Sequence, residues 1–376
     1  MKRSNNEGSI RKRGRTSWEG CVMINNQRRY VYGRTAQEVR KKISSLVWQS
    51  ELGLLADNVD LSLREWLEQW ITSYVRVKDN TLVRYKEDIE QHIVPALGKI
   101  KIGELKTAHL QVFYNNLLRN GMSPKSLKNL HGVLHEALER AVLIDLIPKN
   151  VSNACVLPKV RQAEMHPLVG AEVGRFLDEM KGDPYEDLYY VSLFTGMRQG
   201  EALGLTWDSI RFDCGVIHLQ HQLQKERKKG GKHHLVALKN SEDRYVQPAP
   251  QVLDVLRRIK AAQDIMKRAS GNTWNNEMGL VFVNARGGHL TKVTTYNHLK
   301  VIARRMGKPE LRFHDLRHTY ATLSLQTGAN IKTVSTQLGH ATTAFTLDRY
   351  GHTTDPMRQD AADRMSAFIR EITNET

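Results

Sequence analysis

The stretch Phe313-His314-Asp-Leu-Arg317-His-Thr-Tyr-Ala-Thr322 decides how the C-terminal half of this 376-residue chain is interpreted. It is expected to be helical, and a spacing of three then places His314 and Arg317 on one face of the helix. An imidazole and a guanidinium on one face can both reach a single phosphoryl group. Alone, this pattern only suggests a phosphate site.

A second arginine occurs earlier, in Thr195-Gly-Met-Arg198-Gln-Gly-Glu201-Ala-Leu-Gly-Leu, which predicts a turn that leads into a helix. Arg198 is expected near the positive N-terminal end of that helix, where backbone N–H groups and the guanidinium face a phosphate. Considered alone, such an arginine is as often a surface charge as a ligand.

The third element is Leu338-Gly339-His340, which is followed ten residues later by Tyr350 in Leu-Asp-Arg-Tyr350-Gly-His. A short helix is predicted to begin near Asn330 and to end with Gly339 as a left-handed cap. A lone tyrosine near a C-terminus usually serves packing, so the significance of Tyr350 depends on the elements that precede it.

In this order the three elements resemble the tyrosine recombinase family, in particular the integrases of phages and integrative elements. The resemblance rests on Arg198 with Glu201, on the His-x-x-Arg helix, and on Leu-Gly-His with a tyrosine ten residues further on. It extends over residues 165–355. The family implies a DNA-cleaving and DNA-rejoining enzyme that integrates or excises a mobile element such as a viral genome.

The resemblance implies a role for each residue of the motif. Arg198 and Arg317 would clamp the non-bridging oxygens of the scissile phosphate, His314 and His340 would complete its hydrogen-bond shell, and Tyr350 would be the nucleophile. Fixed donors of this kind stabilise phosphoryl transfer without a metal ion. A 3′-phosphotyrosyl bond retains the bond energy, so no cofactor is expected. Which histidine takes the tyrosine proton stays open between His314 and His340.

The family also uses a lysine in a β-hairpin as general acid for the leaving 5′-oxygen. The resemblance implies Lys239 for this role, in Leu-Lys239-Asn-Ser-Glu-Asp-Arg244-Tyr-Val-Gln-Pro248, because Arg244 and Pro248 fit the spacing. An asparagine follows the lysine where threonine is common, and a glutamine precedes the proline where an aliphatic residue is usual. Lys232 therefore remains the alternative.

The net charge of +16 and the pI near 9.7 indicate a polyanionic partner, with nucleic acid ahead of an acidic membrane. Residues 1–50 hold twelve Lys and Arg but three acidic residues, so they carry +9 of this charge. Aromatic and apolar residues are interleaved with these charges, which favours a folded basic module over a solvated tail.

Residues 1–54 resemble the arm-type DNA-binding domains of phage and transposon integrases. Alternation from Trp18 to Tyr32 predicts a β-hairpin, with a short strand around Ile10 beside it. Thr35-Ala-Gln-Glu38 predicts a capping box that opens one helix, with Arg40, Lys41 and Lys42 on its outer side. The candidate phosphate or base contacts are Arg11, Lys12, Arg13, Arg15, Arg28 and Arg29.

Residues 60–155 are predicted to form a helical core-binding domain, and residues 165–376 the catalytic domain. Capping signals at Ser62-Leu-Arg-Glu65 and Ser123-Pro124 begin two of the helices, and another helix is expected to end at Pro95. Residues 148–162 lose periodicity and are interpreted as the interdomain linker. The fold class is therefore α+β multidomain and mainly α, with a small N-terminal sheet-plus-helix domain.

The catalytic domain is expected to mix helices with strands at residues 216–221 and 235–246, around a polar loop at residues 224–232. A terminal apolar stripe, Met365, Phe368, Ile369 and Ile372, would pack on its own domain or dock on a neighbouring protomer. The family implies a homotetramer on two double-stranded DNA attachment sites, and the help of an excisionase and a host DNA-bending protein.

Three scattered cysteines support neither a disulfide framework nor a zinc site, and the basic N-terminus is followed by no apolar signal segment. A cytoplasmic protein is expected. One alternative is a DNA-binding protein without chemistry, because residues 321–340 also fit a helix-turn-helix with a turn at Gly328. Another is a type IB topoisomerase, but the basic N-terminal module favours recombination between two DNA sites.

Overall fold

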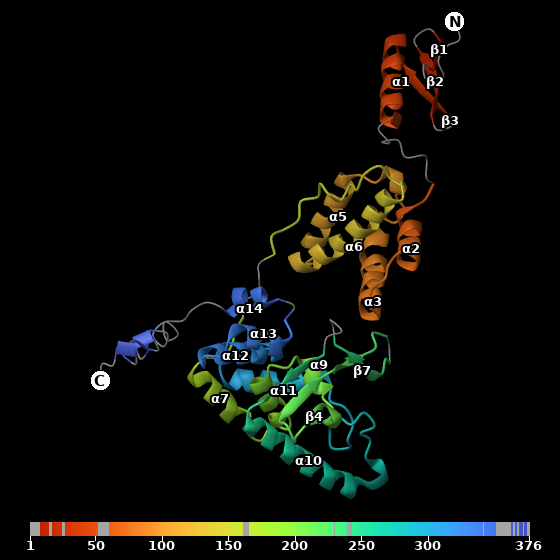
Figure 1. The fold of residues 1–376 in the computed structure, drawn as a ribbon. Helices are drawn as coiled ribbons and strands as arrows, with labels where there is room; N and C mark the ends of the chain where they lie inside the picture. Colours follow the sequence, from red (N-terminus) through yellow and green to blue (C-terminus); the bar gives the residue numbers. More distant parts are fainter. Residues whose placement is uncertain are drawn as a thin grey trace. The chain divides into compact units, whose positions relative to one another are not determined.

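The computed structural model describes most of the chain and divides it into two compact units, Met1–Gln162 and Ala163–Thr376 (Figure 1). It is mainly helical with three small sheets among the described residues, which confirms the predicted fold class. The described residues are 8–14, 17–24, 27–51, 60–160, 165–228, 230–238, 243–340, 342–350, 362–363, 365–366, 368–370 and 372–373.

The N-terminal module is the predicted hairpin with its additional strand and one helix. Strands β1 (Ser9–Lys12), β2 (Trp18–Ile24) and β3 (Gln27–Gly33) form an antiparallel sheet in that order, and α1 (Ala36–Glu51) packs on it. Val22 and Val39 are among the residues buried between them. Gly20 permits this close packing, because a Cβ there would lie 2.5 Å from Cγ1 of Val39.

The start of α1 differs in detail from the predicted capping box. The hydroxyl of Thr35 accepts from the backbone N–H of Glu38 at 3.1 Å, as expected. The Glu38 carboxylate, however, accepts from the backbone N–H of Arg34 at 2.9 Å, one residue before the predicted position. The outward placement of Arg40, Lys41 and Lys42 is confirmed, since all three are exposed.

A bundle of helices forms the second part of the first unit, around a core that includes Trp66 and Trp70. The predicted capping box is confirmed at Ser62 and Glu65, and the hydroxyl of Ser123 caps the helix that Pro124 opens. The elements are α2 (Leu63–Ser73), α3 (Asp79–Asp88), the π-helical turn η1 (Ile89–Ile93), α4 (Val94–Leu97), the 3₁₀ turn η2 (Ile102–Glu104), α5 (Thr107–Arg119) and α6 (Pro124–Leu143).

The prediction that a helix ends at Pro95 is wrong, because the helix passes through this proline to Leu97. Proline normally breaks a helix, since it lacks an N–H and its ring clashes with the preceding turn. Here the turn η1 widens the helix just before Pro95, and the N–H of Val94 bonds to the carbonyl of Ile89, five residues back. Pro95 then stands in the first turn of α4, where it is tolerated.

The first part of the predicted linker is instead part of the helical bundle. Asn150 and Ser152 are buried, and the side-chain amide of Asn150 donates to the carbonyl of His135 at 3.1 Å. Further along, the backbone N–H of Val156 donates to Oε1 of Gln111 at 2.8 Å. Polar side chains of α5 bond to this irregular backbone, and α6 bonds to its polar side chains, which the composition of the segment does not reveal.

The second unit contains the predicted mixture of helices and strands. β4, β5 and β8 form one antiparallel sheet, and β6 pairs with β7 in a hairpin around the predicted polar loop. The elements are α7 (Ala171–Glu179), α8 (Glu186–Thr195), α9 (Gln199–Leu203), η3 (Trp207–Ser209), β4 (Ile210–Arg211), β5 (Val216–Leu219), β6 (His221–Lys225), β7 (His233–Ala237), β8 (Arg244–Val246), α10 (Pro250–Ser270), η4 (Gly271–Thr273), α11 (Lys292–Arg305), α12 (Phe313–Gln326), α13 (Ile331–Leu338) and α14 (Thr343–Tyr350).

Two glycines end helices with left-handed backbone at the place where the sequence motifs meet. Gly196 follows α8 with φ 66°, and Gly339 follows α13 with φ 64°, so the predicted left-handed cap at Gly339 is confirmed. A Cβ on Gly196 would lie 2.5 Å from the ring of Tyr320, and one on Gly339 would lie 2.9 Å from Cδ of Arg244. Glycine at both sites lets α8, α12, α13 and β8 converge.

Candidate active site

Arg198 stands immediately before α9, and Glu201 one turn later holds it in place. The backbone N–H of Arg198 donates to Oε2 of Glu201 at 2.8 Å, and its Nη1 donates to Oε1 at 2.8 Å. The Glu201 carboxylate therefore takes the backbone N–H of Arg198, and the expectation that the helix N-terminus faces a phosphate stays a prediction. The guanidinium also reaches α13, where its Nη2 donates to the carbonyl of Gly339 at 3.1 Å.

Arg317, on α12, is 1% exposed and links two helix ends. Its Nη1 donates to the carbonyl of Gly196 at 2.8 Å, and its Nη2 donates to the carbonyl of Leu338. Burial and the positive charges of Arg198 and Arg244 lower the pKa of Arg317 to about 9. The guanidinium therefore still carries its charge at neutral pH.

Arg244 is a third arginine at the same place, and only its spacing from Lys239 was evident from the sequence. It lies on β8, is 7% exposed, and donates to both oxygens of the Glu201 carboxylate, at 3.0 and 2.7 Å. Its Nε donates to the carbonyl of Gln337 at 2.7 Å. Burial opposes ionisation of Glu201, but the hydrogen bonds and charges of Arg244 and Arg198 outweigh it and lower the pKa of Glu201 to about 2.

The three arginines, which we call the arginine cluster, bond to three consecutive carbonyls at the end of α13. Arg244 donates to the carbonyl of Gln337, Arg317 donates to the carbonyl of Leu338, and Arg198 donates to the carbonyl of Gly339. These carbonyls lack partners within the helix and lie at the negative end of its dipole. The Leu-Gly-His motif therefore serves as a common anchor for guanidinium groups that come from three distant segments.

This anchoring also bears on the helix-turn-helix alternative. α12, a turn at Gly328 with φ 86°, and α13 do form a helix–turn–helix outline. However, α13 buries Val334 and Leu338, and its final carbonyls are bonded to the arginine cluster. The helix pair is thus part of the arginine site, and the arginines that the alternative left unexplained are attached to it.

His340 and Tyr350 lie together beside the arginine cluster. The rings of His340 and Tyr350 stack with 6.3 Å between centroids and 6° between planes. Nδ1 of His340 bonds to the hydroxyl of Thr346, a fully buried residue of α14, at 2.8 Å. Burial and the charges of Arg317 and Arg198 lower the pKa of His340 to about 3, while burial raises the pKa of Tyr350.

His318 was not predicted from the sequence, and its Nδ1 lies 2.5 Å from the hydroxyl oxygen of Tyr350. His314 lies one turn earlier on α12. Its ring and the His318 ring are nearly perpendicular, with 4.7 Å between their centroids. Burial lowers the pKa of His314, with Arg317 adding to the effect. The signal for His318 was its spacing of four from His314, which places both rings on one face.

The structure thus brings five of the six predicted catalytic residues into one region, either through direct contacts or through shared partners. The sixth, Lys239, lies outside the described residues. The alternative, Lys232, is exposed in the loop between β6 and β7, and its backbone N–H bonds to Glu226. Lys232 also lines a cavity with His233 and His289, away from the contacts of the arginine cluster.

The basic residues predicted for the N-terminal module lie on two different faces of its sheet. Residues directly opposite each other in an antiparallel pair share a face. Arg11 pairs with Glu19 and Arg28 with Met23 on the outer face, whereas Lys12 pairs with Trp18 and Arg29 with the buried Val22 on the α1 face. Arg15 lies outside the described residues.

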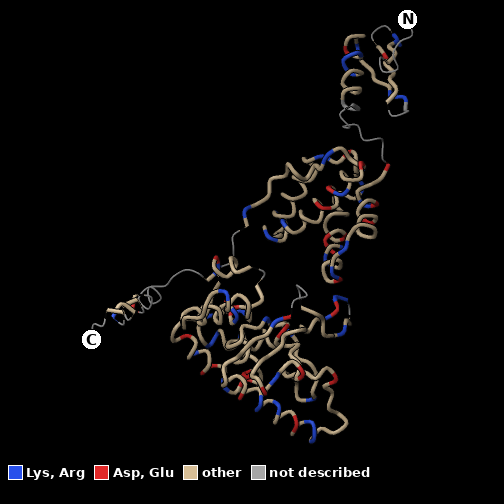
Figure 2. The backbone as a smooth tube through the Cα atoms, viewed as in Figure 1, with Lys and Arg blue, Asp and Glu red and all other residues tan. Residues whose placement is uncertain are grey.

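The outer face combines charge with aromatic side chains. Tyr30 and Tyr32 are 50% and 52% exposed, and the guanidinium of Arg13 lies over the ring of Tyr32. Arg11 and Arg13 both form ion pairs with Glu19, so their charges are partly compensated. Figure 2 shows Lys and Arg on the strands and on the helix of this module.

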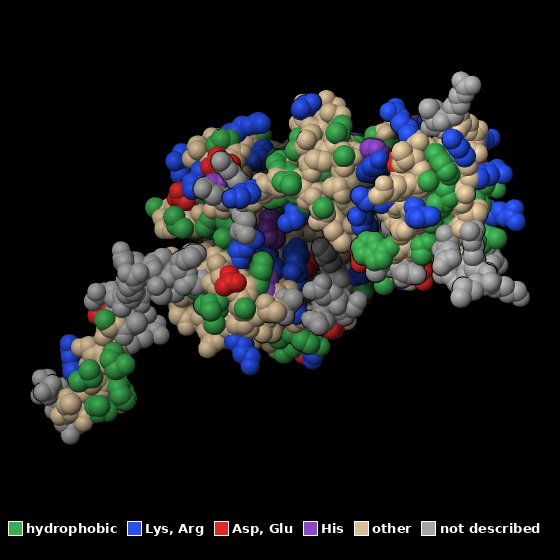
Figure 3. All heavy atoms as spheres, turned by 90° about the horizontal axis from the view of Figure 1, so that it is seen from above, with side chains coloured by type: hydrophobic (Ala, Val, Ile, Leu, Met, Phe, Trp, Pro, Cys, Tyr) green, Lys and Arg blue, Asp and Glu red, His purple; other side chains and the backbone are tan. Residues whose placement is uncertain are grey.

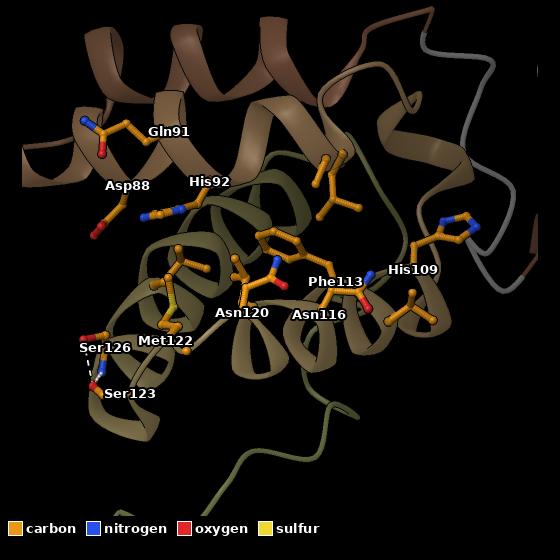
Figure 4. Close-up of a pocket in the computed structure, with 16 residues that line it drawn as sticks. Asp88, Gln91, His92, His109, Phe113, Asn116, Asn120, Met122, Ser123 and Ser126 are labelled. Carbon is orange, nitrogen blue, oxygen red and sulfur yellow. Dashed lines mark hydrogen bonds between the residues drawn. The ribbon is translucent and has the colours of Figure 1, made fainter.

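A cavity of about 900 Å³ lies in the helical bundle, among η1, α4, α5 and the start of α6 (Figure 4). Its walls combine Phe113 with polar side chains such as His92, Asn116 and Asn120. The described residues offer no group of three or more metal-ligating side chains, here or in the second unit. The cavity holds none of the predicted catalytic residues.

The described residues of the terminal apolar stripe are exposed, from 46% at Ile369 to 62% at Ile372. The space-filling view shows hydrophobic side chains gathered on this C-terminal segment, at lower left (Figure 3). The prediction that it packs on its own domain finds no support in these exposures. No helix of the described part of the chain has the length and apolar character needed to cross a membrane.

Two family profiles match the chain. The profile of the phage integrase family matches residues 168–357, and that of the phage integrase N-terminal SAM-like domain matches residues 62–118. A tyrosine recombinase XerC-like protein of Caldanaerobacter subterraneus is 28% identical over 358 residues, which cover 90% of this chain and 91% of that protein. The ICEBs1 integrase of Bacillus subtilis is 25% identical over 311 residues, covering 78% and 79%.

Solved integrase structures share the fold. The Tn1549 transposon integrase in complex with a circular intermediate DNA superposes with a TM-score of 0.69 at 21% identity, covering 81% of this chain and 99% of that one. A lambda integrase from a tetramer bound to a Holliday junction gives a TM-score of 0.54 at 17% identity, covering 89% and 95%.

Proposed function

Because the chain belongs to the phage integrase family and is a tyrosine-type site-specific DNA recombinase, we propose that Tyr350 is the nucleophile that attacks a phosphate held by Arg198 and Arg317. Attack forms a bond from the phenolic oxygen to phosphorus and releases the 5′-oxygen of the DNA. The 3′-phosphotyrosyl bond keeps the energy of the phosphodiester, so the reverse step rejoins DNA without ATP.

One observation carries this proposal: the arginine cluster and Tyr350 lie in one unit, joined through His340 and α13. Phosphoryl transfer develops negative charge on the equatorial oxygens, which fixed cationic donors stabilise without reorganising. Arg198 and Arg317 are already fixed by carbonyls of Gly339 and Leu338. His340, the residue that follows these carbonyls, is stacked on the ring of Tyr350.

The remaining roles follow from the same chemistry. His314 and His340 donate to the phosphate oxygens once DNA is bound, and Lys239 protonates the leaving 5′-oxygen, with Lys232 as the alternative. Both histidines have a lowered pKa without DNA. The negative charge of a bound phosphate favours their protonated forms, which makes them better donors when the substrate arrives.

The N-terminal module is proposed to bind an arm-type DNA sequence, which differs from the core site where strands are cut. Its outer sheet face carries Arg11, Arg13 and Arg28 beside Tyr30 and Tyr32, and a sheet of this width fits a DNA groove. Lys12 and Arg29 lie on the other face and are better placed for the phosphates at its rim. The helical bundle at residues 60–155 is proposed to bind the core site together with residues 165–376.

The proposed assembly is a homotetramer that acts on two double-stranded attachment sites in the cytoplasm, cutting one strand of each duplex at a time. The exposed apolar stripe at Met365, Phe368, Ile369 and Ile372 supports contact with a neighbouring protomer. An excisionase and a host DNA-bending protein are proposed as accessory partners that set the direction of recombination.

Replacing Tyr350 with phenylalanine tests the chemistry. Tyr350→Phe is expected to abolish the covalent protein–DNA adduct on a nicked attachment-site duplex while leaving DNA affinity within about twofold, since only a hydroxyl is removed. Tyr190→Phe, on the partly buried Tyr190 of α8, is the matched control and should form adduct normally. Adduct formation by Tyr350→Phe would show that another nucleophile cuts the DNA.

A further inference from the structure

The hydroxyl of Tyr350 has a defined hydrogen-bond partner before any DNA is bound. Nδ1 of His318 lies 2.5 Å from the phenolic oxygen, although 32 residues separate the two in sequence. His318 follows Arg317 directly on α12, so its backbone is fixed by the same helix that carries the buried guanidinium. The rings of His314 and His318 pack edge to face, with 4.7 Å between their centroids.

The protonation states of the two partners follow from their surroundings. Burial, with the neighbouring His314, lowers the pKa of His318 to about 4, and burial raises the pKa of Tyr350. At neutral pH the imidazole is therefore uncharged and the phenol keeps its proton. In the tautomer with its proton on Nε2, Nδ1 of His318 accepts from the Tyr350 O–H, which is the arrangement that precedes a proton transfer.

The two histidines considered from the sequence are placed differently. His340 lies parallel to the ring of Tyr350, and its Nδ1 is bonded to the hydroxyl of Thr346. His314 meets the ring of His318. Among the described residues, His318 is the histidine with a ring nitrogen bonded to the phenolic oxygen.

We propose that His318 is a further catalytic residue, which accepts the phenolic proton when Tyr350 attacks phosphorus and returns it when the DNA is rejoined. The inference rests on the proposed role of Tyr350. In the forward step the phenolic O–P bond forms, the P–O5′ bond breaks, the phenol proton moves to Nδ1 of His318, and the general acid protonates the 5′-oxygen. In the reverse step each proton returns to its source, so the cycle needs no oxidant or other co-reactant.

The groups around His318 explain how a weak base becomes competent. Without DNA, burial and then the positive charge nearby disfavour a proton on His318, which lowers its pKa. A bound phosphate places negative charge against the arginines, which favours the protonated imidazole. The titratable and charged groups that face His318 are Arg312 just before α12, His314, Asp315 and Arg317 from α12, His340 after α13, and Tyr350 from α14.

Replacing His318 with asparagine separates proton transfer from positioning. The side-chain oxygen of asparagine can still accept from the phenol, but it cannot take the proton. His318→Asn is expected to slow adduct formation at pH 7 by about 100-fold, a typical contribution of a general base. Its rate should rise with pH more steeply than that of the wild type. DNA affinity and hydrogen exchange in residues 343–350 should be unchanged.

The probe is a nicked duplex that carries the attachment core, so that cleavage is irreversible, and the full-length chain is used throughout. His298→Asn is the matched control, because His298 is half-buried in the same unit and bonded to Asp183, outside the site. His318→Ala removes both the bond and the base, and should be at least as slow as His318→Asn; if it fails to fold, the asparagine variant decides alone.

The inference would be overturned if His318→Asn formed adduct with the wild-type rate and pH profile. It would also be overturned if His318→Ala were slow and His318→Asn recovered the rate that His318→Ala loses. Either result would leave His318 as a positioning residue for Tyr350. Failure of the proposed function is distinguishable, since Tyr350→Phe would then still form adduct. If Tyr350→Phe forms none and His318→Asn is normal, Tyr350 remains the nucleophile and another group takes its proton.

Discussion

The arginine cluster and the helix α14 adjoin each other in one unit, but they are held in different ways. Glu201 and Arg317 are each 1% exposed, and the cluster is bonded to one carboxylate and to carbonyls of two helix ends. In α14, Thr346 is the buried residue, whereas Phe345 and Leu347 are 45% and 55% exposed. The proposed phosphate-binding groups are thus preorganised, while the proposed nucleophile stands on a helix with few buried contacts.

This difference suggests that the arginine cluster and α14 have different roles in cleavage. Donors that stabilise a transition state act best when they are fixed before the substrate arrives. Elements with few buried contacts open locally at low free energy and are the ones that move. A tyrosine on such an element can be withdrawn or advanced without disturbing the arginines. Substitutions in either region test whether the two are held as differently as their contacts indicate.

Within the arginine cluster, Arg317→Lys should have the largest effect on cleavage. A lysine ammonium cannot bond to the carbonyls of Gly196 and Leu338 and also present a planar fork to a phosphate. We expect adduct formation to fall by about 10³-fold, measured on the nicked duplex. Arg175→Lys, at an exposed arginine that also donates to a carbonyl, is the control. A loss of less than tenfold would contradict a preorganised cluster.

Acidification should weaken the cluster through Glu201. Its pKa of about 2 in the folded chain lies below the ordinary 4.5, so its stabilisation is complete above pH 4.5 and is lost as pH falls towards 2. A shift of this size corresponds to about 3 kcal/mol. Hydrogen exchange in residues 196–205, corrected for intrinsic rates, measures this loss of local stability.

In Glu201→Gln the neutral amide leaves Arg244 and Arg198 without their carboxylate. The difference in local opening free energy from the wild type should be largest above pH 4.5 and shrink below it. Glu310→Gln, at an exposed carboxylate, should show no such pH-dependent difference. Parallel curves for Glu201→Gln and the wild type would indicate that this carboxylate does not hold the cluster.

Gly339→Ala should loosen the anchor of the cluster. A left-handed backbone costs a non-glycine residue roughly 1–2 kcal/mol, and the added Cβ would lie 2.9 Å from Cδ of Arg244. Gly307→Ala supplies the same strain, since Gly307 has φ 72° and open space around its Cβ position. If the contact with Arg244 matters, cleavage falls about tenfold further in Gly339→Ala, on the order of 1.4 kcal/mol. Equal effects would reduce the role of Gly339 to backbone strain.

Thr346→Val should have the smallest effect, and it acts on α14. It removes the partner of Nδ1 of His340 while keeping the shape of the side chain. Loss of one such bond costs about 1 kcal/mol, so hydrogen exchange in residues 343–350 should accelerate roughly fivefold. Thr327→Val, at an exposed threonine, is the control. If exchange also accelerates in residues 196–205, the two regions are not independently held.

Local signals in the sequence predicted local structure well. The capping box at Ser62, the cap at Ser123 and the left-handed Gly339 depend on a few neighbouring residues, and all three occur. The helix that continues through Pro95 was not predictable in the same way. It requires a π-helical turn, which no residue preference announces.

The site was predictable to the extent that its residues belong to motifs. Arg198, His314, Arg317, His340 and Tyr350 were identified from their order along the chain, and the structure brings them together. The contacts of Arg244 and His318 were not foreseen, because they join segments 93 and 32 residues apart. Spacing can place a side chain on a helix face, but it cannot say which distant segment meets that face.

The outer sheet face of the N-terminal module illustrates the same limit. Composition identified the basic residues, yet the strand register decides which side each one faces. Arg28 and Arg29 are neighbours in sequence and lie on opposite faces. Glu19 also pairs with two arginines that were expected to be available for DNA.

The two glycine-ended helices also affect the net charge of the site. The ends of α8 and α13 each contribute roughly half a negative charge, and ionised Glu201 adds one more. Set against three guanidinium groups, they leave an excess of about one positive charge, which matches the single charge of a DNA phosphodiester. The tyrosyl-linked phosphate is also a diester with a single negative charge. The site with its phosphate is therefore close to neutral both before and after cleavage, and its net charge favours neither state.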